Sequence, residues 1–248
     1  GNGETVLFLH GSGTGVSGHT NFKRNFVALR DAGFRVIRPD LPGFGFSSKP
    51  DNVAYSMDYF NGKLIEFADA LELNQFSLIG NSLGGALSLG LSLNKPERIK
   101  KLILMGSGGI EDMETYNSMP GIQKLLSDFL GGEMNQEKIE GLLKLFPYDS
   151  SIITDEMIED RMQILPLMNP QVLASMKIPN LEDDLGKITH PMLVFWGMDD
   201  KFCPVSGASK IGQKCHDAQI ILFSRCGHWV MIEREEIFNQ TCIDFLNR

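Results

Sequence analysis

Ser82 lies between two glycines, in the stretch LIGNSLGGA at residues 78–86. The glycines Gly80 and Gly84 indicate a sharp strand-to-helix turn, where little room is left for side chains beside an exposed serine. A serine in such a turn is a candidate nucleophile, and it becomes reactive when a neighbouring base takes its proton. The G-x-S-x-G spacing alone is a weak motif, because a glycine-rich loop can hold a serine by chance.

A histidine is the usual base for such a serine, and the chain has five. His228, in SRCGHWVMIE, follows an apolar run and a glycine, which predicts a position at the carboxyl end of a strand. His10 also follows an apolar run, but its setting in HGSGTG is typical of a loop that donates backbone N–H groups. His19, His190 and His216 lie in polar segments without a supporting pattern. A lone histidine is more often structural, so the predicted strand end is what favours His228.

Three carboxylates could orient that histidine. Asp199 and Asp200 follow an apolar run in FWGMDDKFCP, and Asp40 follows another in DLPGFGFS. The Pro-Gly context of Asp40 indicates a turn residue rather than a catalytic acid. The apolar run before Asp199 and Asp200 does not distinguish between them, so both remain candidates for the acid.

Arg161, in TDEMIEDRMQILPLM, does not fit the usual expectation that an arginine in an acidic stretch is a solvated surface charge. On a helix it would lie at the centre of an apolar face, within about 60° of Met157, Ile158, Ile164, Leu165 and Met168. A buried cation costs several kcal/mol unless an anion pairs with it. We therefore predict that Arg161 binds an anionic ligand group, and a carboxylate suits the guanidinium fork.

Six short apolar runs predict the strands that would position these residues. The runs are nearly continuous rather than alternating, as in strands covered on both faces, and helical patterns separate them. This arrangement predicts an α/β protein with a mostly parallel, doubly wound sheet, at whose carboxyl edge functional groups gather. The runs are residues 5–10, 35–40, 76–80, 101–106, 192–197 and 220–224, and the helical patterns are residues 21–33, 57–73, 84–96 and 236–248.

The segment from residue 111 to 185 interrupts the strand–helix alternation. It lacks a convincing strand and is rich in methionine, leucine and acidic residues, which predicts a helical insertion. We expect residues 1–110 and 186–248 to form the core and residues 111–185 to form a lid over it.

The composition is that of an ordinary globular chain, with 248 residues, 42% of them hydrophobic and 22% charged. The net charge of −8 argues against nucleic acid and anionic membranes as partners. No apolar run approaches the roughly 20 residues of a membrane helix. The four cysteines (Cys203, Cys215, Cys226 and Cys242) lack metal-binding spacing, which favours reduced thiols and a cytoplasmic location. We expect no metal and no cofactor.

Five segments together resemble the meta-cleavage product hydrolases of the α/β-hydrolase superfamily. They are HGSGTGVSGHTNFKRN, GNSLGGA, LILMGSGG, WGMDDKFCP and FSRCGHWVMIEREEIFNQTCIDFL. The resemblance runs from Val6 to the C-terminus, and it is weakest across residues 111–185. It implies the α/β-hydrolase fold and hydrolysis of a carbon–carbon bond in 2-hydroxy-6-oxo-hexa-2,4-dienoates, which arise from the fission of aromatic rings. It also implies a small-molecule substrate and a homodimer or higher homo-oligomer.

The resemblance assigns the catalytic roles residue by residue. Ser82, Asp200 and His228 match the triad, in the chain order of the superfamily. Asp200 is selected over Asp199 because its spacing from Gly197 and Pro204 matches the acid turn of the superfamily.

The same comparison of motifs assigns the residues around the triad. Ser12 or Gly13, with Leu83, match the positions that donate backbone N–H groups to an oxyanion. The positions that bind the dienoate are matched by Asn21, Asn81, Ser151, Arg161 and Trp229. Structural alternatives remain for three of these: a helix N-cap for Asn21, a turn residue for Asn81 and a packed aromatic for Trp229.

The chain departs from the family pattern in two places. The family has two more strands before the run at residues 5–10, and only a few residues precede that run here, so we expect a sheet without them. Members that act on aryl ketones often have aromatic residues in the distal pocket. The segment SMKIPNLEDD has Pro179 and no tryptophan, which favours a small or alkyl group on the ketone.

The sequence therefore predicts a hydrolase that ketonises a dienol and then cleaves it with the triad. The alternative is a carboxylesterase with the same triad, and Arg161 distinguishes the two because a simple esterase needs no buried cation. A ligand-binding receptor on the same scaffold is a further alternative, which the complete serine, aspartate and histidine set disfavours. Haloalkane dehalogenases and epoxide hydrolases are excluded, since both need an aspartate in place of Ser82.

Overall fold

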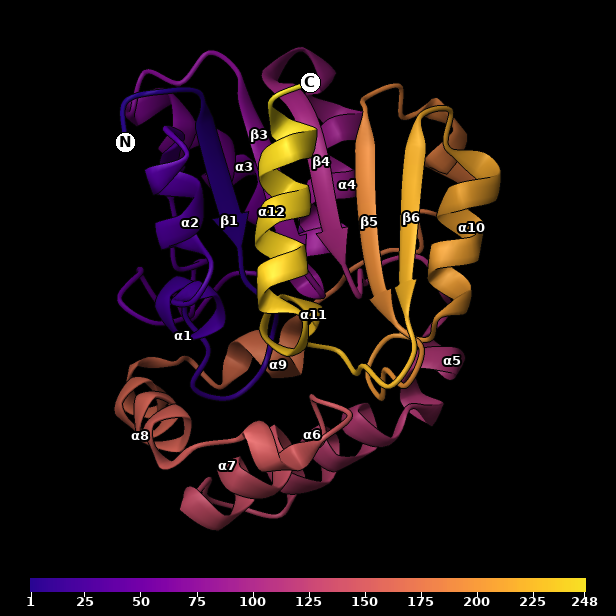
Figure 1. The fold of residues 1–248 in the computed structure, drawn as a ribbon. Helices are drawn as coiled ribbons and strands as arrows, with labels where there is room; N and C mark the ends of the chain where they lie inside the picture. The colour runs from indigo at the N-terminus through magenta and orange to yellow at the C-terminus, as the bar shows by residue number, and fades with distance from the viewer.

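Six parallel strands form one sheet in the order β2-β1-β3-β4-β5-β6, in a computed structural model that describes residues 1–248 (Figure 1). Each predicted apolar run forms a strand, so the predicted doubly wound α/β sheet is confirmed. The strands are β1 (Thr5–Leu9), β2 (Arg35–Ile37), β3 (Phe76–Asn81), β4 (Ile99–Met105), β5 (Met192–Gly197) and β6 (Ala218–Phe223).

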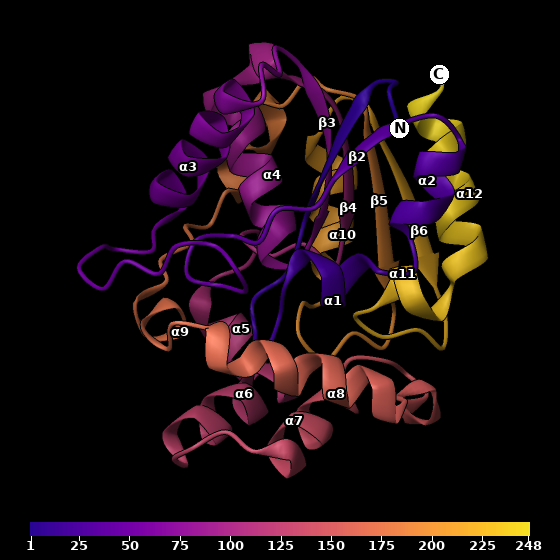
Figure 2. The same cartoon turned by 90° about the vertical axis from the view of Figure 1, so that its left-hand side faces the viewer.

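Helices cover both faces of the sheet, as the side view in Figure 2 shows. One face packs against α3 (Met57–Ala70), α4 (Leu83–Asn94) and α10 (Ser206–Lys214). The other face packs against α1 (Gly18–Phe22), α2 (Phe26–Asp31), α11 (Val230–Glu233) and α12 (Glu235–Leu246). Because both faces are covered, most residues of the central strands are apolar whichever way they point.

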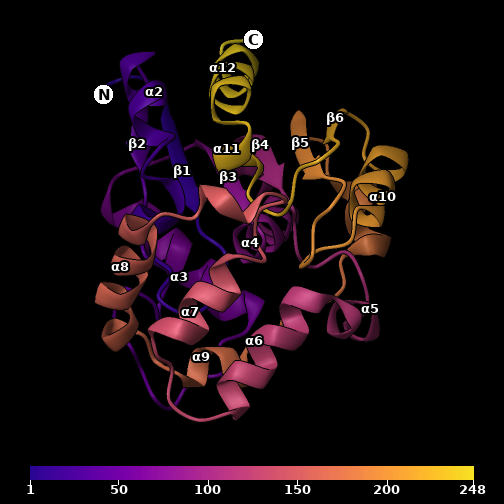
Figure 3. The same ribbon diagram turned by 60° about the horizontal axis from the view of Figure 1, so that its bottom comes forward.

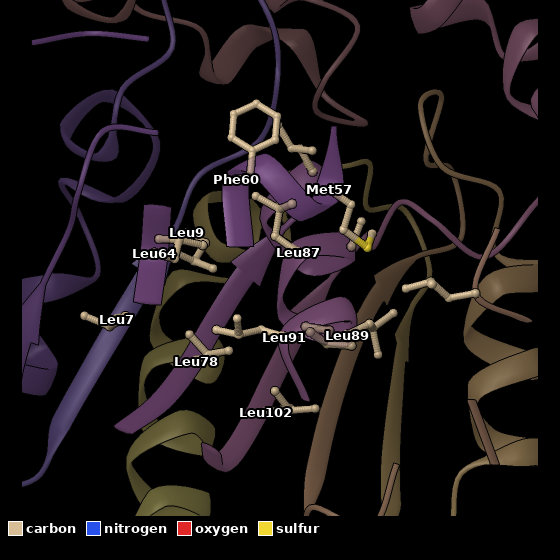
Figure 4. Close-up of a cluster of buried hydrophobic side chains, with 14 of the residues drawn as sticks. Leu7, Leu9, Met57, Phe60, Leu64, Leu78, Leu87, Leu89, Leu91 and Leu102 are labelled. Atoms are coloured by element: carbon tan, nitrogen blue, oxygen red, sulfur yellow. The ribbon is translucent and has the colours of Figure 1, made fainter. Parts of the chain in front are cut away.

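The core divides into two hydrophobic clusters, one on each side of the sheet. Leu7 and Leu9 of β1 point to the cluster under α3 and α4, where Figure 4 shows them with Phe60, Leu64 and Leu87. The alternate residues Val6 and Phe8 point to the cluster under α2 and α12. These clusters hold the strands in register and so fix the sheet edge at which the site lies.

The segment between β4 and β5 contains five α-helices and no strand. These helices lie beyond the carboxyl ends of the strands, as seen from below in Figure 3. They are α5 (Met113–Ser118), α6 (Pro120–Leu130), α7 (Gln136–Leu143), α8 (Asp155–Ile164) and α9 (Gln171–Ser175), with short 3-10 turns at Ser150–Ile152, Leu165–Leu167 and Glu182–Lys187; a further turn, Pro96–Arg98, precedes β4. None of the helices in the chain is both long and apolar enough to span a membrane.

The sequence patterns misplaced some element boundaries. The strand predicted at residues 35–40 ends at Ile37, because Pro39 has no N–H for a ladder hydrogen bond. The helix predicted at residues 21–33 is split into α1 and α2, and it begins earlier, at the N-cap Ser17. The helix α10 was not predicted.

Candidate active site

Ser82 sits in a strained turn between β3 and α4. Its backbone φ is 54° and ψ is −112°, a conformation that non-glycine residues rarely adopt. A Cβ atom at Gly80 would lie 2.3 Å from the Gly84 carbonyl oxygen, and one at Gly84 would lie 1.9 Å from the Leu9 carbonyl oxygen. The glycines around Ser82 are therefore required because β1, β3 and α4 approach one another closely there. The serine itself is partly exposed at the sheet edge.

His228 and Asp200 form a hydrogen-bonded pair near the carboxyl ends of β5 and β6. The His228 Nδ1 atom lies 2.7 Å from Asp200 Oδ2, and both side chains are 1% exposed. The other Asp200 oxygen accepts backbone N–H bonds from Phe202 (2.8 Å) and Cys203 (2.9 Å). These bonds fix the carboxylate so that it orients the imidazole, as the acid of a hydrolytic triad does. Asp199, in contrast, is exposed.

Gly106, which follows β4, packs against this pair and was not singled out from the sequence. A Cβ atom there would lie 2.7 Å from His228 Nδ1 and 2.9 Å from Asp200 Oδ2. Gly106 also has a φ of 49°, which favours glycine. Only a glycine at this position leaves room for the histidine–aspartate hydrogen bond.

We expect Gly106→Ala to lower kcat by about 100-fold, because displacing a catalytic group by about 1 Å has an effect of that size. The matched control is Gly33→Ala, where φ is also positive (100°) but an added Cβ meets nothing within 4 Å. Steady-state kinetics with a chromogenic ester would compare the two. If both variants keep near wild-type kcat, the crowding at Gly106 has no catalytic consequence.

Backbone donors for an oxyanion lie beside Ser82. Ser12 and Leu83 line the same cavity as Ser82, and the N–H groups of Ser12 and Gly13 donate no hydrogen bond within the chain. Leu83 is the first residue of α4, so its N–H has no acceptor within the helix. These free N–H groups can stabilise negative charge on a carbonyl oxygen attacked by Ser82.

The loop that carries His228 is bound to the segment between α7 and α8. The His228 N–H donates to the Phe146 carbonyl oxygen (2.7 Å). The Phe146 ring is stacked between Phe202, with ring centroids 4.1 Å apart, and Trp229, with centroids 4.3 Å apart. Phe146 therefore contacts both the loop of the acid and the loop of the histidine.

Glu233 makes a second link between the same two segments. Its carboxylate accepts N–H bonds from Gly227, next to the histidine, and from Tyr148, each 2.8 Å long. Burial raises the pKa of Glu233, while the two N–H donors oppose that rise. Phe146 and Glu233 were missed by the sequence reasoning because no motif marks a residue whose partners are distant in the chain.

A cavity of about 700 Å³ opens at Ser82 and extends under α5, α6 and α9. Of the 22 residues that line it, 14 are hydrophobic, including Tyr116 and Phe129. A cavity of this volume can enclose a drug-sized ligand. Of the small or alkyl group on the ketone that the segment around Pro179 predicted, an alkyl group makes fuller use of this space, and the identity of the substituent stays a prediction.

Arg161 lines a second, much smaller pocket of about 10 Å³, together with Asn21 and Trp229. It lies on α8, as predicted, and is 4% exposed. Its guanidinium donates one hydrogen bond, to the Thr14 carbonyl oxygen (3.3 Å), and no carboxylate lies within 4.0 Å of it. Burial lowers the pKa of Arg161 to about 10, so the side chain remains a cation at neutral pH.

Two asparagines connect the small pocket to the nucleophile turn. The Asn21 side chain donates to Asn81 Oδ1 (3.3 Å), and Asn81 donates to the Met105 carbonyl oxygen (3.1 Å). The N-cap of α1 is Ser17, so Asn21 has no capping role. Trp229 is both packed against Phe146 and close to Arg161, whose guanidinium carbon lies 5.6 Å from its ring centroid.

Three other candidate residues lie outside this arrangement. Ser151 is exposed in a 3-10 turn that Asp149 caps, and it lines neither cavity, so the structure does not bring it to the site. Asp40 accepts N–H bonds from Gly18 and Phe46 and is a turn residue. Burial lowers the pKa of His10 to about 4, and this neutral histidine holds the loop in place.

Comparisons with known proteins agree with this fold and identify the family. Residues 4–121 match the model of the alpha/beta hydrolase fold family. The chain is 38% identical over 260 residues to the 2-hydroxy-6-oxo-6-phenylhexa-2,4-dienoate hydrolase of Burkholderia cepacia, covering 99% of this chain and 88% of that protein. It is also 38% identical over 259 residues to a 2-hydroxy-6-oxononadienedioate/2-hydroxy-6-oxononatrienedioate hydrolase of Comamonas testosteroni, with the same coverage of 99% and 88%. Among solved structures, a meta-cleavage product hydrolase of Pseudomonas fluorescens superposes with a TM-score of 0.88 at 31% identity, covering 100% of this chain and 92% of that one.

Proposed function

Because the chain belongs to the meta-cleavage product hydrolases, a family with the α/β-hydrolase fold, we propose that Ser82, His228 and Asp200 carry out its catalysis. The chain is a serine-dependent hydrolase of the carbon–carbon bond in 2-hydroxy-6-oxo-hexa-2,4-dienoate-type products of aromatic ring fission. The names of its relatives share the 2-hydroxy-6-oxo-dienoate part and differ in the remainder, a phenyl group in one and a dioate in the other.

The reaction begins with a proton transfer, since direct cleavage of the dienol would release an unstabilised carbanion. His228 moves a proton from the 2-hydroxyl group to C5, which gives a 2,6-diketone. Ser82 then attacks the C6 carbonyl while His228 takes the serine proton, and the N–H groups of Ser12 or Gly13 and Leu83 hold the oxyanion. The C5–C6 bond breaks as its electrons enter the C2 ketone through the C3–C4 double bond, and the resulting dienolate takes the proton held by His228 and leaves as a 2-hydroxydienoate. Water hydrolyses the resulting acyl-serine and releases the carboxylic acid.

One observation supports the dienoate assignment over a simple esterase: Arg161 is a buried cation with no carboxylate within 4.0 Å, and Asp160, the acidic residue that acts on it electrostatically, is already paired with Lys23. A buried guanidinium without an anion is unfavourable, so the site favours a ligand that supplies one. The carboxylate of the dienoate is such an anion. Asn21, Asn81 and Trp229 are the other proposed contacts of this half of the substrate. Asn21 and Trp229 line the pocket of Arg161, and Asn21 bonds to Asn81, which precedes Ser82.

Arg161→Ala tests this proposal. We expect kcat/KM for a dienoate to fall by roughly 30- to 5,000-fold (about 2–5 kcal/mol), the range for one partner of a desolvated charge pair. Hydrolysis of a neutral ester should change by less than about tenfold, because an ester has no carboxylate to lose. Arg161→Lys should recover only part of the loss, since a point charge cannot make the two-pronged contact.

The control is Arg98→Ala, which removes an arginine paired with Asp69 away from the site and should leave both activities unchanged. Dienoate cleavage is followed by the loss of visible absorbance, and ester cleavage by nitrophenol release. Parallel losses on both substrates with a lower Tm would indicate a structural role for Arg161 and would favour the esterase.

Residues 111–185 are proposed to act as a lid, because their helices cover the carboxyl edge of the sheet and line the large cavity. A cytoplasmic location is proposed on the basis of four free cysteines, three of them buried. A homo-oligomer is proposed from the family resemblance, and light scattering would test it.

A further inference from the structure

The large cavity beside Ser82 has mainly apolar walls. Its surface is formed mainly by apolar side chains of α5, α6 and α9, among them Tyr116, Ile122, Leu125, Phe129, Leu173 and Met176. The cavity is far larger than the pocket around Arg161, at about 700 Å³ against about 10 Å³. The space that Ser82 lines is therefore wide and mainly apolar, whereas the cation Arg161 lines a separate, narrow pocket.

No lysine, arginine or histidine lines the large cavity, and its charged residues are both acidic. Glu111 is 8% exposed and accepts bonds from Lys210 Nζ (2.6 Å) and Ser206 Oγ (2.7 Å). Asp112 caps α5 by accepting the Thr115 N–H (2.7 Å). A second anion in this cavity would meet no free cation and would lie near two carboxylates.

We propose that the substituent on the ketone carbon of the substrate is uncharged, apolar and bulky, and that this cavity selects it. The proposal rests on the proposed function, in which Ser82 attacks that ketone carbon. An apolar substituent would bury its surface against α6 and α9, which is favourable in proportion to the area covered. A substituent ending in a carboxylate would lose hydration without gaining a cationic partner, because the only polar groups that line the cavity are neutral or acidic.

The first test compares four dienoates that differ only in the group on the ketone: phenyl, hexyl, methyl and 2-carboxyethyl. We expect kcat/KM for the phenyl and hexyl compounds to exceed that for the carboxyethyl compound by about 100-fold or more, because an unpaired carboxylate must be desolvated. The methyl compound should fall below the hexyl compound, since it fills little of the cavity. Equal or better cleavage of the carboxyethyl compound, or a methyl compound better than hexyl, would overturn the proposal.

A substitution in the cavity wall tests whether this cavity determines which ketone substituent the enzyme accepts. Leu126 lines it and is 46% exposed, so an arginine there can reach water in the free enzyme and should not disrupt folding. Leu126→Arg should raise the carboxyethyl-to-phenyl ratio of kcat/KM by about tenfold or more, as a supplied cation pairs with the carboxylate. The matched control is Leu222→Arg on β6, where leucine is 45% exposed and outside the cavity, and its ratio should equal that of wild type. An unchanged ratio in the Leu126 variant would place the substituent elsewhere and overturn the proposal.

Ester substrates test the cavity assignment without depending on the proposed dienoate activity. In p-nitrophenyl hexanoate and p-nitrophenyl hydrogen succinate, the acyl chain takes the place of the ketone substituent. We expect kcat/KM for the hexanoate to exceed that for the hydrogen succinate by about 100-fold or more, as for the dienoates. Failure to cleave any dienoate while this ester preference holds would overturn the proposed function and support the cavity assignment. Loss or reversal of the ester preference would overturn the cavity assignment.

Discussion

Replacing Ser82 by alanine is expected to abolish both ester and dienoate hydrolysis, with kcat lower by roughly 10⁴- to 10⁶-fold. The variant lacks the hydroxyl that would form the acyl intermediate, and no other nucleophile is available beside the oxyanion donors. Cys203 also lines the cavity near Ser82, but burial raises the pKa of its thiol well above the usual value, so it is not a thiolate at neutral pH. Single-turnover kinetics with a dienoate and steady-state kinetics with an ester would measure the loss.

The fold should survive this substitution, because alanine keeps the Cβ atom that the turn already accommodates. Thermal unfolding should therefore give a Tm within a few degrees of wild type. Ser92→Ala is the matched control: Ser92 is on the same helix, is 2% exposed and bonds only to the Leu89 carbonyl oxygen. A folded Ser82→Ala enzyme with near-normal turnover would show that the nucleophile has been misidentified.

Asp200→Asn should lower kcat by about 10⁴-fold. The Asp200 carboxylate accepts a bond from His228 Nδ1, and this leaves Nε2 free to take the serine proton. An asparagine in the same position would donate an amide N–H to Nδ1, which would place the proton on Nε2 and remove the base. It would also leave the imidazolium without a counter-charge when it forms.

The neighbouring residue provides the control for this prediction. Asp199→Asn changes an exposed carboxylate that makes no contact with His228, so kcat should stay within about twofold of wild type. The two variants have the same change in net charge, which removes long-range electrostatics as an explanation. Equal losses, or a larger loss in the Asp199 variant, would reassign the acid.

Much of the fold could be predicted because burial on both faces leaves a simple pattern in the sequence. Leu7 and Phe8 point to opposite clusters, yet both are apolar, so β1 appears as a continuous run. The position of Arg161 was predictable for a similar reason, since an arginine among apolar residues at helical spacing must point inward.

The remaining features depend on contacts between segments far apart in the chain. Gly106 is an ordinary glycine in sequence, and its importance comes from the approach of His228 and Asp200 to within 3 Å of its missing Cβ. Ser151 matched a family position, but the local turn capped by Asp149 turns it toward solvent. The width of the large cavity depends on how α5, α6 and α9 are spaced, which no local pattern encodes.

The contacts of Phe146 and Glu233 imply a thermodynamic coupling between the position of residues 146–148 and the order of the loop that carries His228. The His228 N–H donates to the Phe146 carbonyl oxygen, and the Phe146 ring is a neighbour of the His228 ring. Moving residues 146–148 away would therefore weaken the contacts that order the histidine loop. Coupling of this kind is reciprocal: a ligand that holds the segment closed stabilises the histidine loop, and an ordered loop favours closure by the same free energy. An event that displaced residues 146–148 would therefore disfavour the ordered histidine loop by the free energy that these contacts contribute to it.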